Sequence, residues 1–239
     1  MKNIFQALCI ITFIGSNSVY SMEENIDQSR QVQTLSEADK IKSLFESAKS
    51  GNTNMLRLLL ATGANVNQQG KYGETPLHVA SKNGHIDTVQ LLIDNKADIN
   101  QKSKFEGSPL TATTSIDTAR LLINSGADVY EEDCVGSTIL HTAARNGWTD
   151  IVKLLINKGA YVNNTTEKIE GGCWKSPLEE TVFSPLYLAA ENGHLEVVKL
   201  LINADPNINQ TDAIDIASKN GHTVIVELLK INNSTALHL

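Results

Sequence analysis

The stretch that decides the fold is Glu74-Thr75-Pro76-Leu77-His78-Val79-Ala80-Ser81-Lys82-Asn83-Gly84-His85. It recurs as Ser137-Thr138-Ile139-Leu140-His141-Thr142-Ala143-Ala144-Arg145-Asn146-Gly147-Trp148, and again as Phe183-Ser184-Pro185-Leu186-Tyr187-Leu188-Ala189-Ala190-Glu191-Asn192-Gly193-His194. Self-similarity that keeps its internal spacing is typical of chains built from stacked units, each too small to bury its own apolar face. The first prediction is therefore a repeat architecture.

Equivalent positions measure the period. The first marker is the leucine or isoleucine that occupies the same place in the first helix of each unit. It occurs at Leu44, Leu77, Leu110, Leu140, Leu186 and Ile214, so that successive markers are 33, 33, 30, 46 and 28 residues apart. A second marker opens the Leu-Leu pair of the second helix, at Leu58, Leu91, Leu121, Leu154, Leu200 and Leu228. The two markers are 14 residues apart in every unit except the third, where they are 11 apart. We therefore expect six units, of which the third lacks three residues in its first helix or the turn after it.

The connections between units also vary. From the second marker to the next first marker the distance is 19 residues three times, then 32, then 14. The fourth connection is thus enlarged by 13 residues and the fifth is shortened by 5. Long connections in an otherwise regular array carry function more often than structure, so specificity is expected near the enlarged one.

The second unit indicates how one repeat folds. Thr75 can cap a first helix, Pro76 suits the first helical position, and Gly84 can close that helix with a positive φ. The second helix follows at once, with an apolar face expected from Ile86, Val89, Leu92 and Ile93.

The first unit lacks the Thr-Pro start and is expected to cap the stack. Ser36 and Asp39 form a capping-box-like beginning. The apolar stripe behind them consists of Ile41, Leu44, Phe45 and Ala48.

These runs and their 33-residue spacing resemble the ankyrin-repeat family. The resemblance implies an all-α solenoid of about six helix-turn-helix units with β-hairpin-like fingers, spanning residues 36–231. The units are expected near 36–67, 68–100, 101–130, 131–163, 179–209 and 210–231, with a finger insertion at 164–183. A polar, flexible linker is expected at 22–35, and a C-terminal tail at 232–239.

The sequence departs from the family pattern at one turn. A glycine precedes the Ala-Asp-like pair as Gly63, Gly126 and Gly159, but Lys96 and Asp205 stand there in two units. A lysine held at positive φ costs about 1 kcal/mol relative to glycine. Replacing Lys96 by glycine is therefore expected to stabilise the fold.

The N-terminus has the layout of a cleavable secretory signal. Met1-Lys2-Asn3 carries one positive charge, and an apolar stretch follows from Ile4 to Ile14. This stretch is about half the length that a membrane span needs. Val19-Tyr20-Ser21 then permits cleavage before Met22, which makes 1–21 the expected signal peptide. A cut after Ser18, a buried first helix and an uncleaved anchor are the alternatives.

Composition narrows the classes of function. The chain has 20 basic and 27 acidic residues and a formal charge of −7, which disfavours binding to nucleic acid or anionic lipid. No zinc-binding or phosphate-loop spacing is present, so we expect no metal, no cofactor and no catalytic residues. His78 and His141 share one repeat position, which indicates an architectural role, and the family resemblance implies hydrogen bonds within and between repeats.

Resemblance also implies that a protein partner binds along the finger tips and the concave face of the first helices. By position, this surface comprises Lys71, Tyr72, Glu74, Lys82, Asn83, Phe105, Arg145, Asn146, Glu191 and Asn192, with Trp148 and Trp174 added. Aromatic side chains favour binding because interface energy concentrates in them. Tyr72 and Phe105 could instead pack on neighbouring fingers, Trp148 could fill the space between repeats, and Trp174 could fold back onto the solenoid.

Two further questions stay open in the sequence. Cys134 lies on the finger before the insertion, so a disulfide with Cys173 is possible. Several Asn-x-Ser/Thr matches occur, which matter only where glycosylation machinery exists.

The sequence thus predicts an exported, monomeric module that binds another protein, without stable membrane insertion of the mature chain. Secreted ankyrin-repeat proteins resemble host-directed factors of intracellular bacteria, which makes a host protein a candidate partner. The alternatives are a periplasmic or cell-surface scaffold for the cell's own proteins, and an enzyme whose site lies in the finger insertion.

Overall fold

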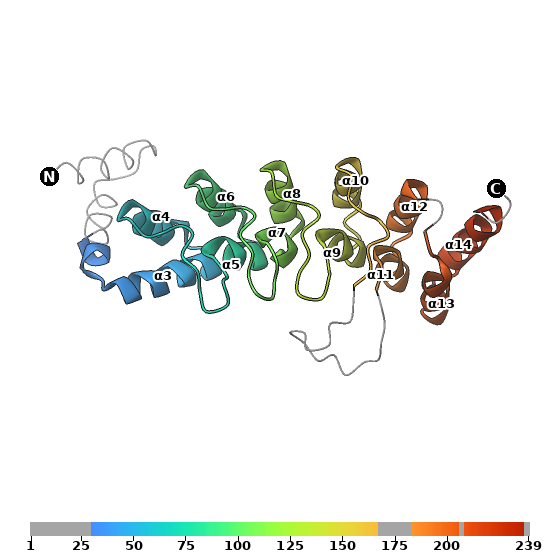
Figure 1. Ribbon diagram of the computed structural model, residues 1–239, viewed down its shortest axis with the longest axis horizontal. Coiled ribbons are helices and arrows are strands. Elements are labelled where there is room, and N and C mark those ends of the chain that lie inside the picture. Colours follow the sequence, from blue (N-terminus) through green and yellow to red (C-terminus); the bar gives the residue numbers. More distant parts are fainter. Residues whose placement is uncertain (1–29, 167–182, 206–207, 237–239) are drawn as a thin grey trace, which may run out of the picture.

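The computed structural model describes residues 30–166, 183–205 and 208–236 of the chain. Figure 1 shows an elongated stack in which each short helix is followed by a second one. The first helices are α3 (Glu37–Ser50), α5 (Pro76–Lys82), α7 (Pro109–Ala112), α9 (Ile139–Arg145), α11 (Pro185–Glu191) and α13 (Thr211–Lys219). The second helices are α4 (Thr53–Ala61), α6 (Ile86–Asp94), α8 (Ile116–Asn124), α10 (Thr149–Asn157), α12 (Leu195–Ala204) and α14 (Thr223–Ala236).

The helices form two parallel rows. Each first helix packs on the first helix of the next pair, and each second helix packs on the next second helix. The fold is therefore the all-α repeat solenoid that the periodicity predicts. A continuous apolar core runs between the rows, since leucines from successive pairs, such as Leu77, Leu92 and Leu110, are fully buried.

The start of each first helix is set by its own residues. Thr75 caps α5 through a capping box: its side chain meets the backbone of His78, and Nδ1 of His78 accepts the backbone N–H of Thr75 at 3.1 Å. Thr138 and His141 repeat this arrangement at α9. The predicted cap at Thr75 is confirmed, and the histidine completes it by satisfying a backbone donor that the helix leaves free.

The N-terminal end of the stack closes differently from the prediction. Ser36 caps α3 and accepts the backbone N–H of Asp39, as expected. However, residues 30–34 are helical and Val32 is buried against the core, although this segment falls within the linker expected at 22–35. Ile41, expected in the apolar stripe, is 37% exposed.

The second helices bury one face each. Val89 and Leu92 of α6 are fully buried, and Ile93 packs on the core from a partly buried position. Ile86, predicted on the same face, is 42% exposed. It lies at the first position of α6.

The third unit is short because its first helix is short. α7 has four residues, where α5, α9 and α11 have seven. Thr113 and Ser115 then lead directly into α8, without the positive-φ glycine that closes the other first helices. The deletion predicted from the sequence therefore removes the last turn of this helix.

The turns after the second helices follow the glycine pattern, with one exception. Gly63, Gly126 and Gly159 all have positive φ, and Lys96 adopts φ 68°, the positive-φ conformation expected of it. Asp205 does not follow, since its φ of −142° is extended. Proline at position 206 explains the difference, because a residue before proline is restricted to extended conformations.

The fingers have no regular strands in the described residues, where one isolated bridge joins Ser103 and Gly107. Backbone hydrogen bonds close the first and third fingers, from Gly70 N–H to the Glu74 carbonyl and from Asp133 N–H to the Ser137 carbonyl. At the C-terminal end, α14 continues to Ala236, so part of the segment expected as a tail at 232–239 is helical. Within the described ranges, no helix is both long and apolar enough to span a bilayer.

Candidate functional site

Neighbouring finger tips are joined by backbone hydrogen bonds. The N–H of Lys104 donates to the carbonyl of Tyr72 at 2.8 Å, and the N–H of Cys134 donates to the carbonyl of Phe105 at 3.3 Å. Three successive fingers therefore hold fixed positions relative to one another. The side chains at the tips of these fingers are therefore held side by side.

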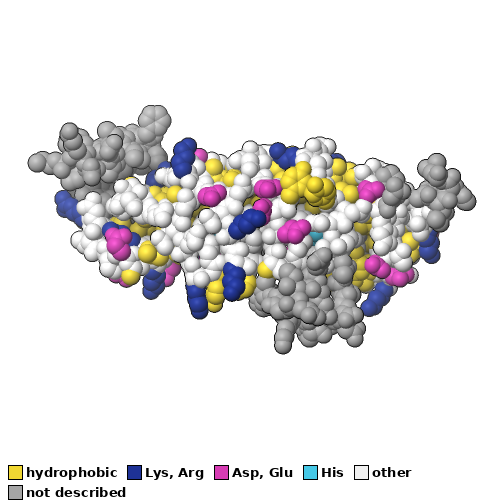
Figure 2. Space-filling model, viewed as in Figure 1, with side chains coloured by type: hydrophobic (Ala, Val, Ile, Leu, Met, Phe, Trp, Pro, Cys, Tyr) yellow, Lys and Arg dark blue, Asp and Glu magenta, His cyan; other side chains and the backbone are white. Residues whose placement is uncertain are grey.

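Two of these tips carry an aromatic side chain beside a lysine. The rings of Tyr72 and Phe105 pack against each other, with centroids 5.1 Å apart and planes tilted by 58°. Lys71 lies 5.2 Å from the centroid of the Tyr72 ring, and Lys104 lies 5.3 Å from that of Phe105. Figure 2 shows such basic and hydrophobic side chains together at the lower edge, where the fingers of Figure 1 end.

A hollow lies between these fingers and the first helices. We call it the α7 groove; it has a volume of about 470 Å³ and is lined by Tyr72, Lys82, Phe105, Glu106, Thr111, Ala112, Asp133, Cys134 and Val135. Its floor is the end of α7 at Thr111 and Ala112, where the other first helices would continue for another turn. The three-residue deletion thus opens the groove.

The polar groups of the groove are largely held by partners. Lys82 pairs with Glu106, and the hydroxyl of Thr111 donates to the Glu106 carbonyl. The carboxylate of Asp133 accepts the N–H groups of Val135 and Ser137, at 2.9 and 2.8 Å. Burial raises the pKa of Asp133, although these two backbone donors oppose the shift. The groove therefore presents mainly the aromatic faces of Tyr72 and Phe105 and the side chain of Val135.

The predicted partner-binding residues divide into two sets. Tyr72, Lys82 and Phe105 come together in the α7 groove, and Lys71 stands at its rim. Glu74 does not join them, because its carboxylate accepts the N–H of Tyr72 at 2.8 Å and so holds its own finger.

The predicted asparagines have an architectural role. Asn83, Asn146 and Asn192 each donate from the side chain to the carbonyl four residues earlier, at 2.8 Å. The same carbonyl also accepts the backbone N–H of the asparagine, so the side chain adds a second hydrogen bond at the helix end. A contact between these amides and a partner stays a prediction that nothing in their geometry favours.

The last predicted residues lie further along the stack. The carbonyls of Arg145 and Glu191 bond the rings of His194 and His222, at 2.9 and 3.1 Å, and their side chains are at or near the surface. Trp148 is partly buried and packs against the core, which agrees with a filler between repeats. Trp174 lies outside the described residues.

The buried histidines have the properties of structural groups. Nε2 of His78 lies 3.0 Å from the carbonyl of Gly107, which ties α5 to the next finger. Burial lowers the pKa of His78, and it lowers the pKa of His141 to about 4. Both rings are therefore neutral near pH 7. In the described part of the chain, no three His, Cys, Asp or Glu residues are grouped as a metal site.

Sequence reasoning missed part of the lining. Thr111 and Ala112 were not predicted, although the deletion in the third unit marks the place where a hollow could form. Cys134 is disulfide-bonded, and its partner lies outside the described residues. The predicted pairing with Cys173 therefore stays a prediction.

Comparison with known families agrees with the geometry. The family described as ankyrin repeats (3 copies) matches residues 15–103, 110–212 and 169–239, which together span most of the chain. The chain belongs to the ankyrin-repeat family. Ankyrin-repeat proteins are typically non-catalytic scaffolds for protein–protein interaction, and their stacked repeats create extended binding surfaces. In this ankyrin-repeat protein, the α7 groove and its two aromatic finger tips are the candidate surface.

Proposed function

We propose that this ankyrin-repeat protein is an exported, monomeric module that binds another protein through the α7 groove. The observation that carries the proposal is the Tyr72–Phe105 pair. Tyr72 remains 45% exposed although it packs on Phe105, so the pair presents an aromatic face above a preformed hollow. Buried aromatic anchors supply much of the free energy of protein association.

The groove is suited to a protein segment more than to a small molecule. Its lining includes exposed side chains from a finger and from a first helix, since Tyr72 is 45% and Lys82 is 59% exposed. Backbone bonds between fingers fix its width, so little conformational entropy is lost when a partner binds.

Export is supported by two features. The N-terminal 21 residues have the pattern of a secretory signal, and Cys134 is disulfide-bonded, which is typical of proteins in oxidising compartments. A host protein is a candidate partner by resemblance to secreted ankyrin-repeat proteins alone. A scaffold that stays in the periplasm or on the cell surface would have the same features, and the location of the mature chain distinguishes the two.

The test is affinity capture with the mature chain, starting at Met22. A partner identified in this way should bind Tyr72→Ala and Phe105→Ala at least about tenfold more weakly than wild type, because truncating a central aromatic contact usually costs more than 1 kcal/mol. Ile86→Ala is the matched control, since Ile86 is a similarly exposed apolar side chain on the second-helix row. Equal binding by all four proteins would show that the groove is not the binding surface.

Localisation needs a separate experiment. N-terminal sequencing of protein recovered from outside the cytoplasm should begin at Met22 or Val19. Recovery only of the intact N-terminus from the cytoplasm would contradict export without affecting the groove.

A further inference from the structure

A row of asparagines joins the bases of neighbouring fingers. Oδ1 of Asn67 accepts the backbone N–H of Asp98 at 2.8 Å, and Oδ1 of Asn100 accepts that of Asp128 at 2.9 Å. Each bond links one repeat to the next across about thirty residues of sequence. In the alignment of the repeats, position 130 is equivalent to Asn67 and Asn100 and would be the next member of this row.

Tyrosines interrupt the row at this point. Tyr130 stands where an asparagine is expected, and Tyr161 replaces the residue that would donate to it. Their rings pack instead, with centroids 5.3 Å apart and planes tilted by 52°. The hydroxyl of Tyr130 donates to the Lys158 carbonyl at 3.2 Å, so its ring is held in place.

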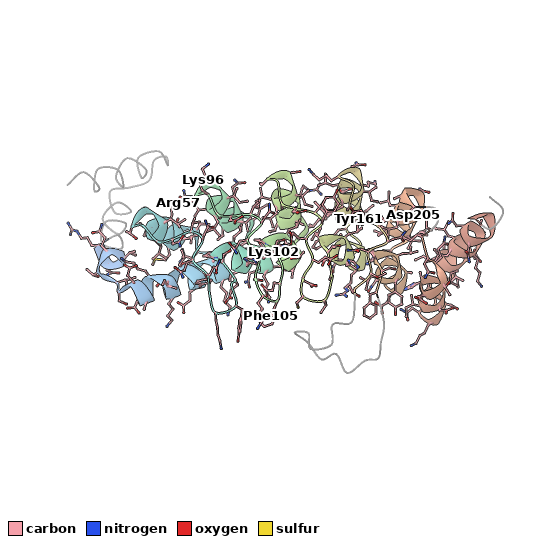
Figure 3. The ribbon with its side chains drawn as sticks, in the orientation of Figure 1. Arg57, Lys96, Lys102, Phe105, Tyr161 and Asp205 are labelled. Carbon is pink, nitrogen blue, oxygen red and sulfur yellow. The ribbon has the colours of Figure 1, made fainter. Side chains whose placement is uncertain are left out.

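This pair is strongly exposed. Tyr130 is 46% exposed and Tyr161 is 70% exposed, more than any other aromatic side chain of the described residues. Figure 2 shows a hydrophobic patch at this level of the stack, and Figure 3 places Tyr161 well away from Phe105 at the finger tips. The pair is therefore a surface separate from the α7 groove.

A small cavity lies beside the rings. We call it the tyrosine site; it has a volume of about 170 Å³ and is lined by Val129, Tyr130, Glu132, Thr138, Ala160, Tyr161 and Asn164. The Glu132 carboxylate accepts a hydrogen bond from the amide of Asn164 at 2.7 Å, which holds it at the cavity wall. No lysine or arginine among the described residues forms an ion pair with Glu132.

The charges around the site favour a cation. Lys102, the nearby cation on the preceding finger, is already paired with Glu131 at 2.8 Å. An apolar partner side chain would desolvate the carboxylate of Glu132 and offer it no bond beyond the one from Asn164, which is unfavourable. A cation would gain both the carboxylate and the negative faces of the two rings.

Among cations, the site fits a guanidinium group. Its planar shape can stack on a tyrosine ring while its N–H groups donate to a carboxylate, and it is more weakly hydrated than an ammonium group. We propose that the tyrosine site binds an arginine side chain of a protein partner. The site extends the proposed function by a second contact surface, and its test does not depend on the α7 groove.

The probe is acetyl-Gly-Arg-Gly-amide, titrated into the mature chain with selectively ¹³C-labelled tyrosine. The expected result is that resonances of Tyr130 and Tyr161 shift with a saturable dependence on peptide concentration, while those of Tyr72 and Tyr187 shift less. The same peptide with citrulline in place of arginine keeps the shape without the charge, and it should give no saturable shift.

Variants separate the contributions. Glu132→Gln keeps the acceptor for Asn164 and removes the charge, so the affinity should fall about tenfold, the loss expected for one charge-assisted contact. Tyr161→Leu keeps apolar bulk without an aromatic face and should abolish the shift at Tyr130. Tyr72→Ala is the control for the α7 groove and should bind the peptide like wild type.

Three results with the peptides and variants would overturn the proposal. They are equal shifts with arginine and citrulline, tighter binding of a leucine peptide, and an unchanged affinity in both Glu132→Gln and Tyr161→Leu. Self-association of the chain that Tyr161→Leu abolishes would assign the surface to a second copy and would also contradict it.

Discussion

His78 bonds the carbonyl of Gly107, 29 residues later in the chain, through its Nε2 at 3.0 Å. Because Nδ1 already accepts the N–H of Thr75, Nε2 carries the ring hydrogen and donates it. The histidine therefore completes a helix cap and holds the next finger at the same time. His141 repeats the cap at Thr138, but its Nε2 lies near the carbonyls of Asn164 and Phe183 without a hydrogen bond of normal geometry. The enlarged fourth finger separates Asn164 from Phe183 in sequence, and it accounts for the difference between His78 and His141.

Because these histidines are buried and neutral, we expect the protein to lose stability in mild acid. The folded pKa of His141 is about 4, lowered from 6.5 by burial, so the unfolded chain binds this proton first as the pH falls. Its stabilising effect is fully present above pH 6.5 and is lost between pH 6.5 and 4, by about 3 kcal/mol in total. The pKa of His78 is shifted in the same direction. Urea unfolding at several pH values should show this decrease, and NMR titration should place both midpoints below that of a free histidine. A midpoint for His141 near 6.5 would contradict the prediction.

Gly147 should not tolerate a side chain. Its φ is 68°, and a Cβ there would lie 2.6 Å from Nδ1 of His194, whose ring is held by the Arg145 carbonyl. Gly147→Ala is expected to destabilise the fold by about 2–4 kcal/mol, from backbone strain and overpacking together. Gly221 is the matched control, since it has φ 78° at the equivalent position but nothing within 4 Å of a Cβ. Gly221→Ala should cost only about 1 kcal/mol. Equal unfolding midpoints for the two variants would contradict the role of His194.

Lys96→Gly should stabilise the protein. Lys96 is the one non-glycine residue with positive φ in the described part of the chain, at 68°. Relief of this strain is worth about 1 kcal/mol, which corresponds to a rise of roughly 2–4 °C in Tm for a chain of this size. Asn95→Gly is the control, because Asn95 has φ −89° and donates to the Leu91 carbonyl. That variant should lower the Tm; a rise in both would show that relief of strain is not the cause.

The disulfide of Cys134 is expected to join Cys173. The chain has three cysteines, and the third, Cys9, lies in the predicted signal peptide. Digestion without reductant should yield one peptide pair containing Cys134 and Cys173. Reduction should then lower the free energy of unfolding by about 2–4 kcal/mol, as loop closure by a native disulfide usually does. A free thiol at Cys173 in the mature chain would refute the pairing.

The local structure of this protein follows from its sequence. Thr75 and Ser36 cap helices because hydroxyl groups satisfy backbone donors a few residues away, and the repeated glycines mark positive φ for the same short-range reason. Even the extended Asp205 is explained by its following proline. The deletion in the third unit was visible in the spacing as well.

The effect of this deletion on the surface was decided by the tertiary structure. The α7 groove exists because α5, α9 and three fingers keep their positions around a first helix that ends a turn early, and no local pattern describes that arrangement. Tyr130 and Tyr161 are likewise 31 residues apart, and their replacement of asparagine and aspartate says nothing of ring packing until the register of neighbouring repeats is known. Short-range hydrogen bonds and backbone sterics are encoded within a few residues, whereas both candidate surfaces arise from contacts between repeats.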